Sequence, residues 1–423
     1  MLLLSEALLV VSALMLGTFA RLGSAAGWML ARQNDGARIA VVGGVCMLCM
    51  YYYDLYDSSM LINLRLALAR LLQVLGTAAL ILALLYTAFP SLTLSRQSIF
   101  LGLALAGVLV AGWRRLFFQL SRASWLNEPV LMVGDGALAE KLAGEFLSRP
   151  ELGMRPAASA CAAEAWNPAG AAPLRRAIVT LPQPWPDWVQ RLGERGMRLQ
   201  DGAAMYERIT GQVALEAGRA PRVPARARIT LRRKRLFSLL LAAAGLLLAW
   251  PLMLLIALAI RLDSPGPALF RQRRVGWQGR PFTLLKFRSM VVGADAGGNA
   301  QPAAPNDPRC TRLGRWLRRC RLDELPQLWN ILRGDMSLVG PRPFVPEQEA
   351  ACARAIPGYS LRWQVPPGAT GWAQVHRGYC ATLEDNREKL AYDLFYVKNL
   401  SFSLDLVILF QTLKILLLGR GGR

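Results

Sequence analysis

The chain has 423 residues, too many for one ordinary domain, and its composition is apolar for a soluble protein. Its formal net charge of +22 favours anionic lipid and phosphate-bearing partners over nucleic acid, because the basic residues lie beside long apolar runs and glycine turns. Its seven cysteines are scattered, which argues against a disulfide framework, and its single histidine, His376, excludes a histidine-based metal cluster and a Ser-His-Asp triad.

Residues 1–126 predict a bundle of four transmembrane helices. Each of four apolar runs is near the length that crosses a bilayer: Leu2–Ala20, 39–56, 71–89 and 99–118. Buried core helices are the alternative, but such runs have little else here to pack against. The first run lacks a basic leader and a small-residue cleavage site, so we expect an anchor and not a removed signal peptide. The positions of the arginines favour cytoplasmic ends for this bundle.

Residues 127–225 predict a Rossmann-like α/β domain. Val130–Val133 is typical of a short buried strand, and a glycine turn and a helix-like run to Leu147 follow it. Ala177–Leu181 is typical of a second buried strand. This order of strand, glycine turn and helix is the one expected at the start of a dinucleotide-binding fold.

The same region gives only a weak indication of a bound cofactor. The turn Gly134-Asp135-Gly136 carries an acidic residue that would repel a pyrophosphate. We therefore favour a scaffold or dimerising domain, which makes a homodimer the expected assembly. Pro156–Pro173 is rich in Ala and Pro, and we expect a poorly ordered surface segment there.

The apolar run at about 236–260 is long enough to span a membrane, but its flanks disagree with that interpretation. Arginines lie on both sides of the run, which conflicts with the positive-inside rule. Pro251 lies in its middle, where it removes a backbone hydrogen bond. A re-entrant helix that enters and leaves on one leaflet satisfies both observations, and an ordinary span is the alternative. Near the end of the chain, 402–418 is apolar but short, and suits an interfacial helix.

After this helix, Arg271–Phe287 predicts two paired strands around Gly276 and Gly279. Lys286 and Arg288 alternate with apolar neighbours, so both side chains are expected to project toward a phosphate. A solvated strand face is the alternative interpretation.

The stretch from 309 to 344 surrounds a carboxylate pair, Asp323-Glu324, with arginines. Thr311–Arg319 predicts a basic helix with Leu313, Trp316 and Leu317 on one side, and a second helix is expected to start at the pair and stop at Gly334. A helix N-terminus keeps a carboxylate ionised and also favours phosphate. Simple helix capping would explain most acidic pairs, but a carboxylate among arginines suits attack on a phosphoryl group, with Mg²⁺ to reduce the repulsion.

Three motifs in this half of the chain resemble a known family. RLDELPQLWNILRGDMSLVGPRP (321–343) closely resembles the signature of the bacterial sugar transferases, the monotopic polyprenyl-phosphate phosphoglycosyl transferases. RQRRVGWQGRPFTLLKFRSM (271–290) and PPGATGWAQV (366–375) are similar to the other motifs of that family, in the same order. The resemblance covers roughly 226–423. The long upstream region resembles the large subfamily, and LEDNREKLAYDLFYVKNLS (383–401) most resembles the branch associated with exosortase-type exopolysaccharide systems.

The resemblance implies roles for individual residues. Asp323 would be the nucleophile, and also a ligand for Mg²⁺, while Glu324 would activate the acceptor or position the metal. Arg318 would hold the donor phosphates together with Lys286 and Arg288, and the Pro341, Arg342 and Pro343 element would bind the nucleotide end. The family's membrane anchor commonly breaks at a Ser-Pro pair, where this chain has Trp250-Pro251. The roles of His376 and Asp393 are left open.

The sequence therefore predicts a multi-domain membrane protein with a four-span bundle, a Rossmann-like domain and a mixed α/β catalytic domain at 226–423. We expect it to transfer sugar-1-phosphate from a UDP-sugar to undecaprenyl phosphate on the cytoplasmic face of a bacterial inner membrane. One rival is a non-catalytic membrane scaffold. The other is a membrane nucleotide-sugar dehydratase or epimerase, which the absence of any Tyr-x-x-x-Lys pair disfavours.

Overall fold

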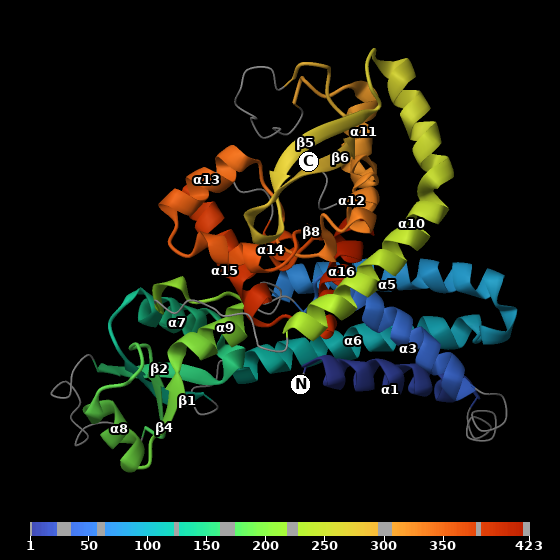
Figure 1. Ribbon diagram of the computed structural model, residues 1–423. Coiled ribbons are helices and arrows are strands. Elements are labelled where there is room, and N and C mark those ends of the chain that lie inside the picture. Colours follow the sequence, from blue (N-terminus) through green and yellow to red (C-terminus); the bar gives the residue numbers. More distant parts are fainter. Residues whose placement is uncertain are drawn as a thin grey trace. The chain divides into compact units, whose positions relative to one another are not determined.

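The computed structural model describes most of the chain (Figure 1). The described residues are 2–22, 35–56, 64–121, 127–160, 174–217, 227–294, 307–377 and 382–417. They form two compact units. The second unit contains Gly134–Ala139, Ile178–Arg191 and Leu199–Arg423, and the first contains the remaining residues up to Arg198.

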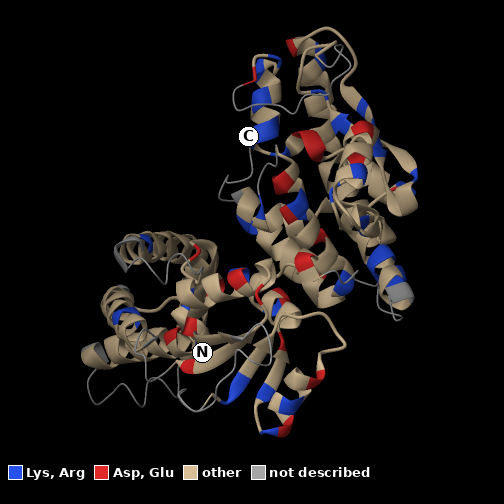
Figure 2. Ribbon diagram, turned by 90° about the vertical axis from the view of Figure 1, so that its left-hand side faces the viewer, with Lys and Arg blue, Asp and Glu red and all other residues tan. Residues whose placement is uncertain are grey.

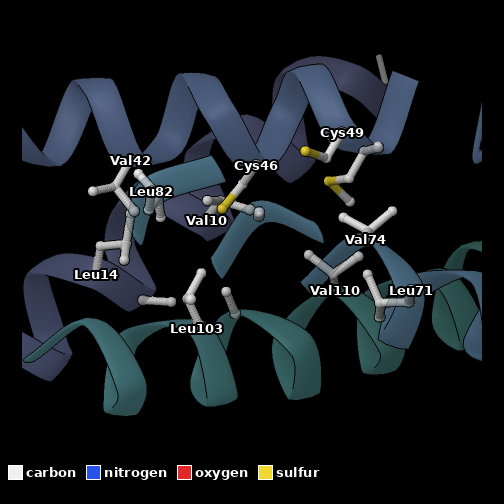
Figure 3. Packing of buried hydrophobic residues seen from close by; sticks show 14 of the residues in the cluster. Val10, Leu14, Val42, Cys46, Cys49, Leu71, Val74, Leu82, Leu103 and Val110 are labelled. Carbon is white, nitrogen blue, oxygen red and sulfur yellow. The ribbon is translucent and has the colours of Figure 1, made fainter. Parts of the chain in front are cut away.

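The first unit begins with four apolar helices. They are α1 (Leu2–Leu22), α3 (Asp35–Tyr52), α5 (Leu64–Ala88) and α6 (Arg96–Ser121), with a short 3₁₀ helix η2 (Pro90–Leu92) before the last. Their shared core is aliphatic and contains the Cys46 and Cys49 side chains, which lie among valines and leucines of the other helices (Figure 3). A buried ion pair joins Arg114 of α6 to Glu6 of α1, with Nε and Oε1 atoms 2.7 Å apart.

Four described helices are long and apolar enough to cross a membrane. Three belong to the predicted bundle and the fourth is the long helix further along the chain: Leu2–Ala20, Ala67–Ala88, Gln97–Leu120 and Ile229–Asp263. The remaining predicted span is the shorter apolar helix Gly36–Tyr52. At 1.5 Å per residue that helix is about 25 Å long, somewhat less than the hydrocarbon thickness of a typical bilayer.

An α/β region follows the bundle helices in sequence. Its elements are β1 (Glu128–Val133), α7 (Ala137–Ser148), η3 (Pro150–Leu152), β2 (Met154–Ala160), β3 (Arg176–Val179), α8 (Asp187–Glu194), β4 (Arg198–Asp201), α9 (Gly202–Thr210) and η6 (Leu215–Ala217). The four strands form one sheet in the order β2-β1-β3-β4. β1 and β2 run parallel and are joined through α7, which confirms the predicted strand, turn and helix.

One prediction for this region is wrong in part. Residues 156–160, expected in a poorly ordered segment, belong to β2. Because β2 lies beside β1 in parallel register, from Met154 opposite Glu128 to Ala160 opposite Val133, the backbone of this segment has a partner despite its Ala- and Pro-rich composition. Residues 161–173 lie outside the described part of the chain.

A single long helix, α10 (Ala227–Asp263), opens the transferase-like half of the chain. It contains Pro251 without interruption, and Figure 1 shows that it changes direction along its length. One face of α10 carries exposed Leu, Ile and Trp side chains, whereas Lys234, Ser238, Ala242 and Ile260 on another face are buried.

The remaining elements form a mixed α/β assembly within the second unit. In chain order they are β5 (Leu269–Val275), η7 (Trp277–Gly279), β6 (Pro281–Phe287), α11 (Arg312–Arg319), η8 (Leu322–Glu324), α12 (Gln327–Arg333), β7 (Ser337–Val339), α13 (Pro346–Ala355), η9 (Tyr359–Gln364), β8 (Gly368–Thr370), α14 (Trp372–His376), α15 (Leu383–Lys398) and α16 (Phe402–Leu417). β5 and β6 form the predicted antiparallel hairpin, and β7 and β8 form a short parallel pair. Figure 2 shows acidic and basic residues mixed over these elements, whereas the bundle helices carry few charges.

Candidate active site

The basic helix before the carboxylate pair forms as predicted. α11 starts after Thr311, whose hydroxyl accepts the Gly314 N–H at 2.9 Å as an N-cap. Leu317 is fully buried against α10, and Leu313 packs beside it. Trp316, one turn from Leu313 on the same helix, is 52% exposed, so the buried part of that side is formed by the two leucines.

The carboxylate pair lies in a separate 3₁₀ turn, η8, and not at the start of α12. Arg321 precedes this turn with a positive φ of 57°, and α12 begins only at Gln327, after Pro326. The predicted end of the second helix is confirmed, because Gly334 caps α12 with a φ of 85°. The pair is therefore held by a tight turn between two helices.

One carboxylate oxygen of Glu324 forms ion pairs with three cationic side chains. Its Oε1 lies 2.9 Å from Lys286 Nζ, 3.1 Å from Arg342 Nη2 and 3.5 Å from Arg321 Nη1. Burial alone would raise the pKa of Glu324, but these three charges outweigh it and hold the pKa well below its ordinary range. Glu324 is therefore ionised at neutral pH, and its charge holds the three cations around it.

Asp323 has the opposite environment, although it is the next residue. It is 7% exposed, and its carboxylate accepts no hydrogen bond from the residues that the structure describes. Burial raises the pKa of Asp323, the Lys286 ammonium opposes that rise, and Glu324 adds to it. An ionised Asp323 would therefore have its oxygen lone pairs free for a reacting atom or a metal ion.

The two basic residues predicted for this strand, Lys286 in β6 and Arg288 just after it, have different partners. Lys286 contacts Glu324, and burial lowers the pKa of its ammonium group despite that contact. Arg288 is 6% exposed and donates to the carbonyls of Ile260, Ser264 and Pro265 at the end of α10. The expectation that Lys286 and Arg288 project together is not met, because the helix end engages the Arg288 guanidinium.

Two further predicted residues lie at the site in different ways. The Arg318 guanidinium donates to Cys310 Sγ at 3.1 Å, and its charge also lowers the pKa of Asp323, although less than burial raises it. The Pro341-Arg342-Pro343 loop follows β7, and Arg342 reaches back to Glu324. The structure thus brings Lys286, Arg342 and the carboxylate pair together.

A buried ion network supports this loop, and sequence reasoning missed most of it. Arg362 is 2% exposed and donates to Asp393 at 2.8 Å, to Glu349 at 2.7 Å and to the Arg342 carbonyl at 2.8 Å. Asp393, whose role the sequence left open, is therefore one carboxylate partner of an arginine that holds the Arg342 backbone. The available signal in the sequence was the position of Arg362 between Leu361 and Trp363, which is typical of a charged residue that is buried with a partner.

Asn330 is a second residue that sequence reasoning missed. Its side chain is fully buried and pairs with β6, accepting the Leu285 N–H at 2.9 Å and donating to the Thr283 carbonyl at 2.7 Å. It also donates to Asp335 Oδ2 at 3.1 Å. Because Lys286 follows Leu285 directly, Asn330 fixes the strand that carries the catalytic-site lysine.

His376 lies away from this carboxylate pair's contacts. Its ring is exposed, its Nδ1 lies 3.0 Å from the Trp372 carbonyl, and it stacks on Tyr392 with ring centroids 5.2 Å apart. No group of three or more His, Cys, Asp or Glu side chains arranged for a metal occurs in the described part of the chain. Mg²⁺ nevertheless fits Asp323, because this ion is commonly held by one or two carboxylates together with substrate phosphates and water.

The fold and the site describe a protein with membrane-length helices and a basic cluster around two adjacent carboxylates. One of these carboxylates contacts three cations, and the other accepts no hydrogen bond from the described residues. A family model described as bacterial sugar transferase matches residues 229–419. The chain belongs to the bacterial sugar transferase family.

Three named relatives are similar to this chain over this region. A UDP-N-acetylgalactosamine-undecaprenyl-phosphate N-acetylgalactosaminephosphotransferase from Aeromonas hydrophila is 46% identical over 45% of this chain and 45% of its own length. A UDP-glucose:undecaprenyl-phosphate glucose-1-phosphate transferase from Xanthomonas campestris is 46% identical over 42% of this chain and 37% of its own length. A protein of the same name from Caulobacter vibrioides is 49% identical over 44% of this chain and 70% of its own length. The chain thus spans less than half the length of the first two relatives.

Proposed function

We propose that this protein transfers sugar-1-phosphate from a UDP-sugar to undecaprenyl phosphate and releases UMP. The names of two relatives state a sugar phosphotransfer between a UDP-sugar and undecaprenyl phosphate for those proteins. The observation that carries the proposal is the difference between the two adjacent carboxylates. Glu324 is neutralised by three cations, whereas Asp323 is buried and accepts no hydrogen bond from the described residues. The proposed nucleophile is thus the neighbour of a carboxylate that gathers three cations able to attract an anionic substrate.

In the first step, an Asp323 carboxylate oxygen attacks the β-phosphorus of the UDP-sugar. The new bond joins that oxygen to phosphorus, the bond from phosphorus to the bridging oxygen breaks, and UMP leaves with its electron pair. An aspartyl phosphosugar remains. In the second step, a phosphate oxygen of undecaprenyl phosphate attacks the same phosphorus, which regenerates the Asp323 carboxylate and gives the polyprenyl-diphosphate sugar.

The other residues prepare the site for this chemistry. Arg342 and Lys286 are held against Glu324, so their remaining N–H groups are available to the donor diphosphate. All three cations contact Oε1 of Glu324, which leaves Oε2 and Asp323 as the oxygens that would hold Mg²⁺. When bound, Mg²⁺ would supply charge neutralisation for the departing UMP.

The contacts of α10 support a helix that stays on one leaflet. From Lys234, which pairs with Asp405 at 3.1 Å, to Ile260, which packs with Leu317, its buried face contacts the transferase half. These two positions are about 39 Å apart along a helix, more than the roughly 30 Å hydrocarbon thickness. A perpendicular span would draw this polar assembly into the bilayer, so we propose the re-entrant geometry, with the site on the cytoplasmic face.

The upstream α/β region is proposed to be Rossmann-like and to act as a scaffold, and a homodimer through it remains our proposal. The product would begin the assembly of a surface glycan. One relative, from Rhizobium leguminosarum, is named an exopolysaccharide production protein, and is 43% identical over 92% of its own length.

The test is release of UMP by the purified full chain in nanodiscs, with undecaprenyl phosphate, Mg²⁺ and a panel of UDP-sugars. Release with one or two sugars that is abolished in Asp323→Asn supports the proposal and identifies the donor. Release at the wild-type rate by Asp323→Asn would remove Asp323 as the nucleophile. A scaffold function predicts no release from any donor.

A further inference from the structure

Residues 202–217 lie upstream of the part of the chain that matches the family, which begins at residue 229, yet they pack on the transferase elements. This segment contains α9, the turn at Gly211 and η6. We propose that it is a positioning element for Arg342, and so for the reaction given above, on which this inference rests.

Three polar contacts fix the segment to α14 and α15. The Val213 N–H donates to the Ala391 carbonyl of α15 at 3.0 Å. The Trp372 indole N–H, at the start of α14, donates to the Gly211 carbonyl at 2.8 Å. At the end of α15, Lys398 Nζ lies 2.6 Å from Glu207 Oε2.

The turn at Gly211 is shaped for this contact. Gly211 has a φ of 68°, and a Cβ there would lie 3.0 Å from the Trp372 ring. The glycine therefore serves both the left-handed turn after α9 and the close approach of the indole. Trp372 in turn stacks on Phe395 of α15, with ring centroids 5.8 Å apart.

The Val213 side chain packs in a buried cluster that includes a partner of Arg362. Val213 is 4% exposed and shares a buried cluster with Tyr359, Leu390 and Leu394. The Tyr359 hydroxyl accepts from Arg362 Nη1 at 3.1 Å. Val213 therefore supports the outer side of the elements whose inner side carries the partners of Arg362.

The sequence of contacts ends at the active site. Leu390 and Leu394 flank Asp393 on α15, and Asp393 holds Arg362 by two hydrogen bonds of 2.8 and 3.0 Å. Arg362 holds the Arg342 carbonyl at 2.8 Å, and Arg342 reaches Glu324. Removing the Val213 side chain should loosen α15 and let Arg342 depart from its position, while Lys286, fixed by Asn330 through β6, stays in place.

The experiment measures kinetics and hydrogen exchange in the full chain. Val213→Ala should lower kcat/KM for the UDP-sugar about fivefold, within the range of remote substitutions that act through packing. In an Arg342→Ala background the same substitution should change kcat/KM less than twofold, because the residue that it positions is gone. Val130→Ala, an equally buried truncation in β1, is the matched control and should leave kcat/KM within twofold of wild type.

Hydrogen exchange separates this inference from the proposed function, because it needs no turnover. In Val213→Ala, peptides covering 341–344 and 359–364 should exchange faster, whereas peptides covering 283–288 should not change. Glu207→Gln, which keeps the side-chain volume, should give the same pattern more weakly. Unchanged exchange at 341–344 in both variants would overturn the inference, as would an equal loss of kcat/KM with and without Arg342. If the wild-type protein released no UMP, the proposed function would be overturned, whereas the hydrogen-exchange result would still decide whether the segment positions Arg342.

Discussion

Replacing Arg362 with methionine tests the buried network that supports the active-site loop. Arg362 is 2% exposed, and its guanidinium satisfies Glu349 and Asp393, which are themselves 2% exposed. Methionine fills a similar volume but leaves two carboxylates without their cation. Removing one partner of a buried ion pair destabilises a protein by about 3–5 kcal/mol.

That free energy corresponds to a large change in melting temperature. A loss of 1 kcal/mol lowers Tm by about 2–4 °C in domains of 150–250 residues, so Arg362→Met should lower Tm by about 6–20 °C. The assay is thermal unfolding of the full chain in one detergent at pH 7, followed by intrinsic tryptophan fluorescence.

A compensated variant isolates the cause. The triple variant Arg362→Met, Glu349→Gln, Asp393→Asn removes the unpaired charges along with the arginine, so it should recover at least half of the lost Tm. A Tm for Arg362→Met within 2 °C of wild type would refute the reasoning. So would a triple variant that is less stable than the single variant, because charge burial would then not be the source of the loss.

Three further predictions follow from the site. Lys286→Met removes the main charge that opposes the raised pKa of Asp323, so the acid limb of the rate profile should move to higher pH. An unmoved limb in a titration of kcat/KM would count against Asp323 as the ionising group. Asn330→Ala leaves the Leu285 N–H and the Thr283 carbonyl without partners, so it should lower the free energy of unfolding by about 2–4 kcal/mol. Denaturant unfolding measures this loss, and a loss below about 0.5 kcal/mol would show that β6 needs no such support. A chelator should abolish UMP release and added Mg²⁺ should restore it, while a chelator-resistant rate would exclude the proposed role of the metal.

Local patterns predicted much of the secondary structure. The hairpin of β5 and β6, the basic helix α11 and the Gly334 stop of α12 all depend on residues close together in sequence, and all are confirmed. α12 starts later than predicted, at Gln327 after Pro326, and does not include the acidic pair. In the structure the pair forms its own turn after the left-handed Arg321.

The contacts of the site could not be predicted in the same way, because they join distant segments. Alternation along 286–288 indicated that Lys286 and Arg288 share a direction, but β6 ends at Phe287 and the carbonyls that follow α10 engage Arg288. Likewise, nothing near Arg362 in sequence indicates Glu349 or Asp393 as partners. The sequence pattern alone drew attention to the carboxylate pair, whereas the residues that hold it became clear only from the tertiary structure.

The most direct test of the account is to look for the phosphosugar on Asp323. The full chain in nanodiscs is mixed with the active UDP-sugar and Mg²⁺ without undecaprenyl phosphate, quenched, digested and examined by mass spectrometry. The account predicts one sugar-phosphate adduct on the peptide that contains Asp323, which disappears when undecaprenyl phosphate is added and is absent from Asp323→Asn. UMP release that proceeds only with acceptor present, with no adduct on any peptide after rapid quenching, would contradict the two-step mechanism.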